Sequence, residues 1–303
     1  MRKVLVILVN YNSETDTKVC VDSLFRHEEE CDVNVVIVVN AFKQKKILNE
    51  LSNDERVNIL YPESNIGFGR ANNYALDWAF KHLDFEYVYV LNNDTVIDRG
   101  VITALAKVLD EERDVVIATP RIMYLSEPEK VWYGGGEIRM SSGRPYIYDF
   151  GEYPSKSRSL KDRYVTFVSG CSMLFKRDFF DKNTLFDDRF FMYCEDLELC
   201  IRINRMGLKM KYLGSIYIYH KVHGSAASHN KNNYSGTHIK NPNLAFHFLN
   251  IYRNRRIAMN MHLNGKEKFV FNLLFFFDVS FHALKFSLNG RFKPALMWFK
   301  ILF

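Results

Sequence analysis

The sequence predicts an α/β fold in which helices flank a central, mostly parallel β-sheet. Two observations predict it: apolar runs rich in β-branched residues recur through the first 118 residues, and segments with helical periodicity separate them. Because these runs have no polar face, the strands are expected to be buried on both sides, as in parallel sheets. The 303 residues, 48% hydrophobic and 25% charged, suit one large globular domain or one domain with an extension.

The predicted elements of the first half follow in order. Strands are expected at Val4–Val9, Val33–Val39, Val57–Leu60, Tyr87–Leu91 and Val115–Ala118. A helix capped by Ser13 is expected to run to about His27, and a polar helix is expected at Lys43–Leu51. Apolar residues at positions 71, 74, 75, 78 and 79 have the spacing of one helical face and predict another helix.

The second half begins differently. Residues 125–163 are rich in Gly, Ser, Tyr and Arg and predict a long surface excursion, which at this length is usually functional. Strand character returns at Val165–Phe175, and a helix is expected from Glu195 to Met206, closed by Gly207. Short strands are predicted at Lys209–Leu213 and Ile216–Tyr219.

Basic charge is concentrated at the C-terminus. The chain carries 41 basic and 35 acidic residues, a net charge of +6. From Ile251 onward nine Lys or Arg stand against two acids, so the remainder is close to neutral. This argues against a nucleic-acid-binding body and predicts contact between the C-terminal region and anionic phospholipid or a partner.

Cysteine usage and the N-terminus indicate the compartment. The five cysteines form no CxxC pair, which favours a reducing, cytosolic setting. Residues 2–12 show no signal-peptide pattern, and no stretch of 18 apolar residues predicts a membrane span. We therefore expect a cytoplasmic protein that contacts the inner face of the cell membrane peripherally.

Polar side chains follow four successive strands. Tyr11 lies in the Asn-Tyr-Asn segment after the first strand, and Asn40 follows the second. The segments after the third and fourth strands contribute Asn65, Gly67, Asn73, Asn92, Asn93 and Asp94. Because ligands of open α/β sheets bind beyond the carboxyl ends of the strands, these residues predict a nucleotide site. The alternative is that Asn and Gly only terminate strands.

Two residues are candidate metal ligands. Asp94 follows an apolar strand, where a carboxylate can hold Mg²⁺ or Mn²⁺ between phosphates. His220 follows the last predicted strand and could bind through a neutral imidazole. Alternatively, Asp94 caps a turn and His220 has a structural role. His223 is a nearby competitor for the role of ligand.

Glu195 and Asp196 begin a helix directly after an aromatic segment. Acids in a first helical turn are ordinary partners of the helix dipole. Alternatively, an acid beneath aromatic walls is a candidate general base, because desolvation raises its pKa toward the working range.

These pieces together resemble glycosyltransferase family 2 on the GT-A fold, especially its rhamnosyltransferase-like branch, over about residues 3–256. The matching segments are Val9–Asn12, Asn65–Phe68 with Asn73, Leu91–Asp94, Trp132–Gly135, Ser169–Leu174, Phe186–Arg202, His220–Val222 and Tyr252–Asn254.

The resemblance implies roles for single residues. Tyr11 would stack on the nucleobase, Asp94 and His220 would bind the metal, and Asp196 would be the catalytic base. The nucleotide site would also include Asn40, Asn65, Gly67, Asn73, Asn92 and Asn93. The donor sugar or acceptor would be bordered by Trp132, Gly170 and Glu195.

The sequence departs from the family pattern at three positions. Val39 stands where the family often has an Asp that contacts the base, which leaves the identity of the base open. Asn92 replaces the first acid of the DxD-type motif, so one metal carboxylate is missing. Glu198 stands where a second Asp is common.

The resemblance implies an inverting, metal-dependent glycosyltransferase. The donor would be a nucleotide-diphosphate sugar of the dTDP-rhamnose or UDP-hexose type, and the acceptor a glycan or lipid-linked hydroxyl in cell-surface polysaccharide synthesis. An alternative is a non-catalytic nucleotide-sugar-binding or scaffold protein that retains the fold. A dinucleotide-binding oxidoreductase is disfavoured because no GxGxxG follows the first strand.

The expected organisation has three parts. Residues 1–223 would form the catalytic domain, with a nucleotide-sugar half at about 1–118 and an acceptor half at about 119–223. Residues 224–243 would be a linker or mobile loop, and residues 244–303 a basic, aromatic helical extension. Its segment Phe269–Leu288 would pack on the body or on a second subunit of a homo-oligomer, or lie on the cytoplasmic leaflet.

Overall fold

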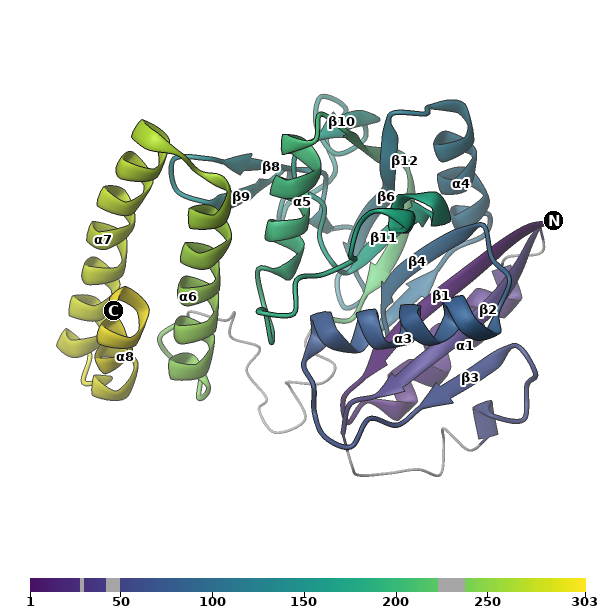
Figure 1. The fold of residues 1–303 in the computed structure, drawn as a ribbon, viewed down its shortest axis with the longest axis horizontal. Coiled ribbons are helices and arrows are strands. Elements are labelled where there is room, and N and C mark those ends of the chain that lie inside the picture. The colour runs from purple at the N-terminus through teal and green to yellow at the C-terminus, as the bar shows by residue number, and fades with distance from the viewer. Residues whose placement is uncertain (28–29, 42–49, 223–237) are drawn as a thin grey trace.

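A ten-stranded mixed sheet organises the computed structural model, which describes residues 1–27, 30–41, 50–222 and 238–303 (Figure 1). The main strand order is β10-β12-β6-β11-β4-β1-β2-β3, while β5 pairs with β12 and β7 with β6. The strands are β1 (Arg2–Asn10), β2 (Cys31–Val39), β3 (Val57–Leu60), β4 (Tyr87–Asn92), β5 (Thr95–Ile97), β6 (Val115–Tyr124), β7 (Val131–Tyr133), β10 (Arg163–Val165), β11 (Ser172–Lys176) and β12 (Lys209–His220).

The N-terminal half of the sheet is parallel, as predicted. β1 pairs in parallel with β2 and β4, and β2 pairs in parallel with β3. Leu5, Ile7 and Leu8 of β1 are fully buried, because both faces of the strand are covered by the rest of the fold. β11 then enters antiparallel between β4 and β6, which makes the whole sheet mixed.

Helices pack against this sheet. α1 (Glu14–His27) and α3 (Phe68–His82) contact β1 and β2, and α4 (Val101–Glu111) contacts β6 and β12. Two shorter elements follow β11, the 3-10 helix η1 (Arg177–Asp181) and α5 (Glu195–Arg205). The helix predicted at Lys43–Leu51 lies largely outside the described residues, as does most of the predicted linker at 224–243.

Residues 125–163 are more ordered than the sequence predicted. Besides β7, they contain a separate hairpin of β8 (Gly136–Arg139) and β9 (Arg144–Ile147). The buried carboxylate of Asp149 accepts hydrogen bonds from the hydroxyls of Ser155 (2.8 Å) and Ser159 (2.7 Å). A Cβ on Gly134 would collide with Tyr148 O. The backbone of this segment is therefore closely packed at that point, although the segment contains few apolar residues.

Two strand predictions differ from the structure in detail. The predicted strand Val165–Phe175 is split into the end of β10 and most of β11, with residues 166–171 between them. The two short strands predicted after α5 are one strand, β12, interrupted by a register shift between Leu213 and Tyr217. A β-bulge of this kind bends a strand without ending it.

Three helices form the C-terminal extension, at the left of Figure 1: α6 (Leu244–His262), α7 (Gly265–Leu288) and α8 (Phe292–Leu302). α6 packs on α5, and α7 and α8 pack on α6 and on each other. Asp278 of α7 forms ion pairs with Arg144 of β9 and Arg255 of α6, each at 2.7 Å. Burial raises the pKa of Asp278, but His282, Arg255 and Arg144 outweigh it and hold the pKa well below its usual range.

α7 stands out among the helices of the described residues. By length and composition it is the one apolar enough to cross a membrane, although the sequence led us to expect no span. Within its apolar window 22% of the residues are buried, so most residues of that window are at least partly exposed in the described structure.

Candidate functional site

The carboxyl ends of three parallel strands meet at one edge of the sheet. In the strand register Val9 of β1 lies beside Asn92 of β4, and Asn10 lies beside Val39 of β2. Asn40 continues this edge, because its N–H donates to Asn10 O at 2.8 Å. Tyr11 follows immediately after β1 and its side chain is 41% exposed. The strand ends predicted to bind a nucleotide are therefore adjacent in the fold.

Three later segments return to the same edge. The N–H of Asn92 donates to Cys171 O at 2.9 Å, which places the loop before β11 beside the end of β4. The Gly170 N–H donates to Asp196 Oδ2 at 3.1 Å, so the first turn of α5 lies against this loop. β12 ends there too, because its last residue, His220, pairs with Thr95 of β5.

Asp94 and His220 form a buried pair. His220 Nε2 lies 3.0 Å from Asp94 Oδ1, and their side chains are 6% and 9% exposed. Asn92 Nδ2 lies 3.4 Å from the same imidazole nitrogen. The ring of Trp132 meets the imidazole edge to face at 4.5 Å between centroids. The other ring nitrogen, His220 Nδ1, is buried and has no hydrogen-bond partner among the described residues.

These donors fit a divalent cation only in part. Across the described ranges, no group of three or more His, Cys, Asp or Glu side chains could hold a metal ion. Asp94 and His220 therefore supply two ligands at most. Mg²⁺ is commonly bound through one or two carboxylates and completed by substrate phosphates, so the donor set fits an ion whose remaining ligands come from substrate and water.

Of the two acids that open α5, Glu195 is buried and Asp196 is partly exposed. Glu195 is 7% exposed, and within the described part of the chain its Oε2 has no hydrogen-bond partner. Burial, and then the charge of Asp196, raise the pKa of Glu195 to about 8. Burial also raises the pKa of Asp196, although N–H groups of Gly170 and Leu197 donate to its carboxylate and oppose the rise. Carboxyl groups with raised pKa values at a shared edge suit acid–base chemistry near neutral pH.

Several predicted nucleotide ligands hold loops together within the chain. Asn40 accepts a hydrogen bond from Ile66 N–H (2.9 Å) and donates one to Gly67 O (3.1 Å). Asn65 Oδ1 accepts the Gly67 N–H at 3.0 Å. Gly67 has a φ of 85°, and a Cβ there would collide with Phe191 O, which places this loop against the aromatic segment before α5.

Asn73 and Asn93 are likewise engaged. Asn73 donates to Phe186 O at 2.8 Å and accepts from Phe186 N–H at 3.0 Å. Asn93 is buried and donates to the hydroxyls of Ser13 (2.7 Å) and Thr17 (2.8 Å) in the loop and helix after β1. Contacts of these two residues to a nucleotide stay a prediction, whereas their structural contacts fix the loops of the edge.

The sequence did not single out the contacts between α5 and the C-terminal extension. Buried Glu198 accepts hydrogen bonds from Arg202 (3.2 and 3.3 Å), and its Oε1 lies 3.0 Å from Nε2 of His262 on α6. Asn254 of α6 donates to two carbonyl oxygens just before α5. Its partners are backbone atoms far along the chain, and no residue pattern indicates such contacts.

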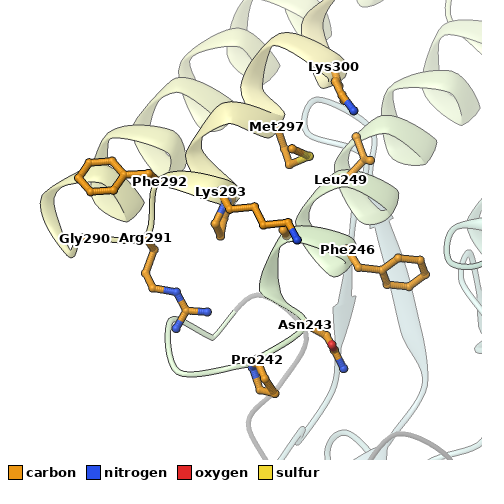
Figure 2. A pocket seen from close by; sticks show the side chains of 12 residues that line it. Pro242, Asn243, Phe246, Leu249, Gly290, Arg291, Phe292, Lys293, Met297 and Lys300 are labelled. Carbon is orange, nitrogen blue, oxygen red and sulfur yellow. The ribbon is translucent and has the colours of Figure 1, made fainter.

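A cavity of about 490 Å³ lies away from the strand edge, between α6 and α8 (Figure 2). Its lining combines apolar side chains such as Phe246, Leu249 and Met297 with the cations Arg291, Lys293 and Lys300. No sequence motif predicted this cavity.

The chain is similar to proteins of known class. The model of glycosyl transferase family 2 matches residues 5–184. The rhamnosyltransferase WbbL of Escherichia coli K12 is 23% identical over 229 residues, which are 73% of this chain and 84% of that protein. The N-acetylglucosaminyl-diphospho-decaprenol L-rhamnosyltransferase of Mycobacterium tuberculosis is 34% identical over 82 residues, 26% of this chain and 27% of that protein.

Solved structures share the fold. GalNAc-T7 with UDP, GalNAc and Mn²⁺ superimposes with a TM-score of 0.60 at 15% identity, over 73% of this chain and 44% of that one, so this chain spans less than half of its length. The mannosyltransferase PcManGT of Pyrobaculum calidifontis, solved with GDP-Man and Mn²⁺, gives a TM-score of 0.56 at 15% identity over 98% of this chain and 74% of that one. The family match covers more than half of the chain and agrees with the GT-A fold, and the chain belongs to glycosyl transferase family 2.

Proposed function

We propose that the protein is an inverting glycosyltransferase that moves a sugar from a nucleotide-diphosphate donor to an acceptor hydroxyl. The observation that carries the proposal is the meeting of Tyr11, the Asp94–His220 pair and Asp196 at one sheet edge. The family match and the rhamnosyltransferase name of WbbL support a donor of the dTDP-rhamnose or UDP-hexose type.

The donor would bind across the ends of β1, β2 and β4. The half-exposed ring of Tyr11 can stack on the nucleobase. Asp94 and His220 would hold Mg²⁺ or Mn²⁺ beside the diphosphate, as the Mn²⁺ in the two similar solved structures suggests. A cation there would stabilise the negative charge that develops on the leaving diphosphate.

Asp196 would act as the base. Its carboxylate is held by the N–H groups of Gly170 and Leu197, which fixes its direction without neutralising it. In the ionised form it can take the proton of the acceptor hydroxyl while that oxygen attacks the anomeric carbon. One base and one in-line displacement invert the anomeric centre, as in inverting glycoside hydrolysis with an alcohol in place of water.

The acceptor is proposed to be a glycan or lipid-linked hydroxyl in cell-surface polysaccharide synthesis. The decaprenol-linked name of the mycobacterial relative supports a lipid-linked acceptor. The protein would act in the cytoplasm, with peripheral membrane contact through the basic C-terminal region. The expected homo-oligomer stays a prediction.

A second candidate function is non-catalytic binding of a nucleotide sugar. The observation that favours it is the replacement of an acid by Asn92, which leaves two metal donors at most. Donor binding to the wild-type protein without hydrolysis or transfer, with either Mg²⁺ or Mn²⁺ present, would support this alternative.

The test compares Asp196→Asn with the wild type and with Asp77→Asn, a control at an exposed position of α3. Release of nucleoside diphosphate from dTDP-rhamnose and UDP-sugars is measured with an acceptor present. Asp196→Asn should lower kcat at least about 100-fold, the usual contribution of a general base, while the donor still raises the melting temperature. Turnover retained in Asp196→Asn would remove this residue from the role.

A further inference from the structure

The outer face of the C-terminal extension is apolar and uncovered. α7 turns Phe271, Phe275, Val279 and Phe286 inward, where Phe275 packs against Tyr252 and Phe286 against Phe248 of α6. Large apolar side chains on the other face of α7 are more than half exposed, among them Phe269, Phe277, Phe281, Leu284 and Leu288, as is Phe299 of α8. Single exposed apolar residues are ordinary, but several on one face of a helix are typical of an interaction surface.

The charge beside this face is positive. The two acids after Ile251 are both neutralised within the chain, Glu267 by Arg205 (2.8 Å) and Asp278 by Arg144 and Arg255. The cavity at the base of α8 is lined by Arg291, Lys293 and Lys300 and by no acidic residue. Figure 2 shows these cations on the α8 side of the cavity and the side chains of Phe246 and Leu249 on the α6 side.

We propose that the outer face of α7 and α8 docks on an anionic phospholipid bilayer, with a lipid phosphate seated in the cavity among Arg291, Lys293 and Lys300. An apolar face flanked by cations that have no acidic partner among the described residues complements a bilayer, which offers acyl chains below and phosphates above. A protein partner for this face would need an apolar surface bordered by acidic side chains. This inference rests on the membrane contact proposed above and identifies the surface that makes it. Catalysis on soluble substrates does not depend on this surface.

The test measures co-sedimentation of the full chain with vesicles of phosphatidylcholine alone or with 30% phosphatidylglycerol. The paired variant Lys293→Gln and Lys300→Gln changes two exposed side chains. It should weaken binding to the anionic vesicles about 25-fold, roughly fivefold for each charge removed near such a surface. The control pair Lys81→Gln and Lys107→Gln, on α3 and α4, should bind as the wild type does.

Three outcomes would overturn the inference: equal wild-type binding to both vesicles, no loss in the Lys293/Lys300 pair, or a dimer that Phe277→Ser with Phe281→Ser dissociates. A salt titration of the unmodified protein needs no variant and should reduce anionic binding steeply. Nucleoside diphosphate release in solution should be the same in the Lys293/Lys300 pair and the wild type. Failure of the docking surface is thereby distinguished from failure of the proposed activity.

A second inference rests on the backbone before α5. Tyr193 and Cys194 have φ angles of 71° and 67°, two successive left-handed conformations in residues that carry a side chain. Such conformations persist only where surrounding contacts hold them. They fix the direction in which the chain enters α5, and therefore the positions of Glu195 and Asp196.

α6 supplies the contacts that hold this backbone. Asn254, 3% exposed, donates through Nδ2 to Met192 O at 2.9 Å and to Tyr193 O at 3.0 Å. The hydroxyl of Tyr193 lies 2.8 Å from His247 Nδ1, and the thiol of Cys194 lies 3.5 Å from Ile251 O. These four contacts involve three residues on one face of α6: His247, Ile251 and Asn254.

We infer that Asn254 is a positioning residue for Asp196, which acts by holding the left-handed pair at 193 and 194. The inference rests on the proposed role of Asp196 as the base. It makes the C-terminal helix α6 a functional part of the catalytic domain, since the helix that carries the base takes its orientation from α6.

The test replaces Asn254 by Ala and uses Asn250→Ala as the control, because Asn250 lies one turn earlier on α6 and donates to Phe246 O in its own helix. Asn254→Ala should lower kcat at least tenfold with the donor KM within about twofold, and Asn250→Ala should change neither. Adding Cys194→Gly to Asn254→Ala should restore much of kcat, because glycine adopts the left-handed conformation freely.

A readout independent of activity is the labelling of Cys194 by a thiol reagent. Asn254→Ala should expose the Cys194 thiol and accelerate its labelling, whereas the buried Cys20, Cys31, Cys171 and Cys200 should react as before. Wild-type kcat in Asn254→Ala, or unchanged Cys194 labelling, would overturn the inference. If the wild type itself showed no transfer, faster Cys194 labelling in Asn254→Ala would still support the positioning geometry, and the proposed base role of Asp196 would fail.

Discussion

Replacement of Glu195 by Gln should remove a large pH dependence of stability. The pKa of Glu195 is raised from 4.5 to about 8 by burial and by the charge of Asp196. Because the folded chain holds this proton more tightly than the unfolded chain, the stabilisation is complete below about pH 4.5 and is lost as the pH rises to about 8. The pKa difference corresponds to roughly 5 kcal/mol, at about 1.4 kcal/mol for each tenfold change in proton affinity.

The assay is urea unfolding of the wild type, Glu195→Gln and the exposed control Glu55→Gln at pH 5, 7 and 9. Glutamine cannot ionise, so the stability of Glu195→Gln relative to the wild type should increase by several kcal/mol between pH 5 and pH 9. The free energy of unfolding of Glu55→Gln should change with pH as that of the wild type does. If the unfolding free energy of Glu195→Gln showed the same pH dependence as the wild type, the folded chain would not hold the Glu195 carboxyl group in its protonated form. The conclusion that burial and Asp196 raise its pKa would then be wrong.

Three further changes test other parts of the site. Asp94→Ala should abolish the dependence of donor affinity on Mn²⁺ in calorimetric titrations, and an effect of chelator as large as in the wild type would contradict metal binding there. Tyr11→Ala should weaken donor binding roughly tenfold without changing the melting temperature, since the ring is 41% exposed and stacking contributes about 1–3 kcal/mol. Gly67→Ala should lower the melting temperature by several degrees more than Gly207→Ala, because both glycines have positive φ but only at Gly67 would the added Cβ strike Phe191 O. Equal losses in the two glycine variants would refute this packing argument.

The regular part of the fold follows from local patterns. Strands β1, β2 and β4 are continuous apolar runs, and burial on both faces makes such runs easy to recognise. The order in residues 125–163 escaped prediction because it depends on the hydroxyls around Asp149 and on the tight approach at Gly134. Neither contact leaves a hydrophobic period in the sequence.

The site was predictable to a different degree at each level. Polar strand ends predicted the edge itself, because parallel strands place their carboxyl ends together. The resemblance to the family suggested the pairing of Asp94 with His220, which spacing alone could not indicate. The structural engagement of Asn40, Asn73 and Asn93 could not be foreseen, since an amide side chain serves a loop or a ligand with the same chemistry.

The pairing of β12 with β5 has a consequence for the order in which the protein matures. β12 is the last strand of the sheet in the chain, and it brings His220 to Asp94. A nascent chain that has emerged only as far as β11 can assemble β1, β2 and β4, but it lacks the imidazole. Long-range pairing of this kind forms late in folding because closing a long loop costs entropy before contacts compensate it. In the proposed metal site, a chain that ends before β12 would therefore lack one of the two protein ligands, and the site would be complete only once the last strand of the described sheet has paired.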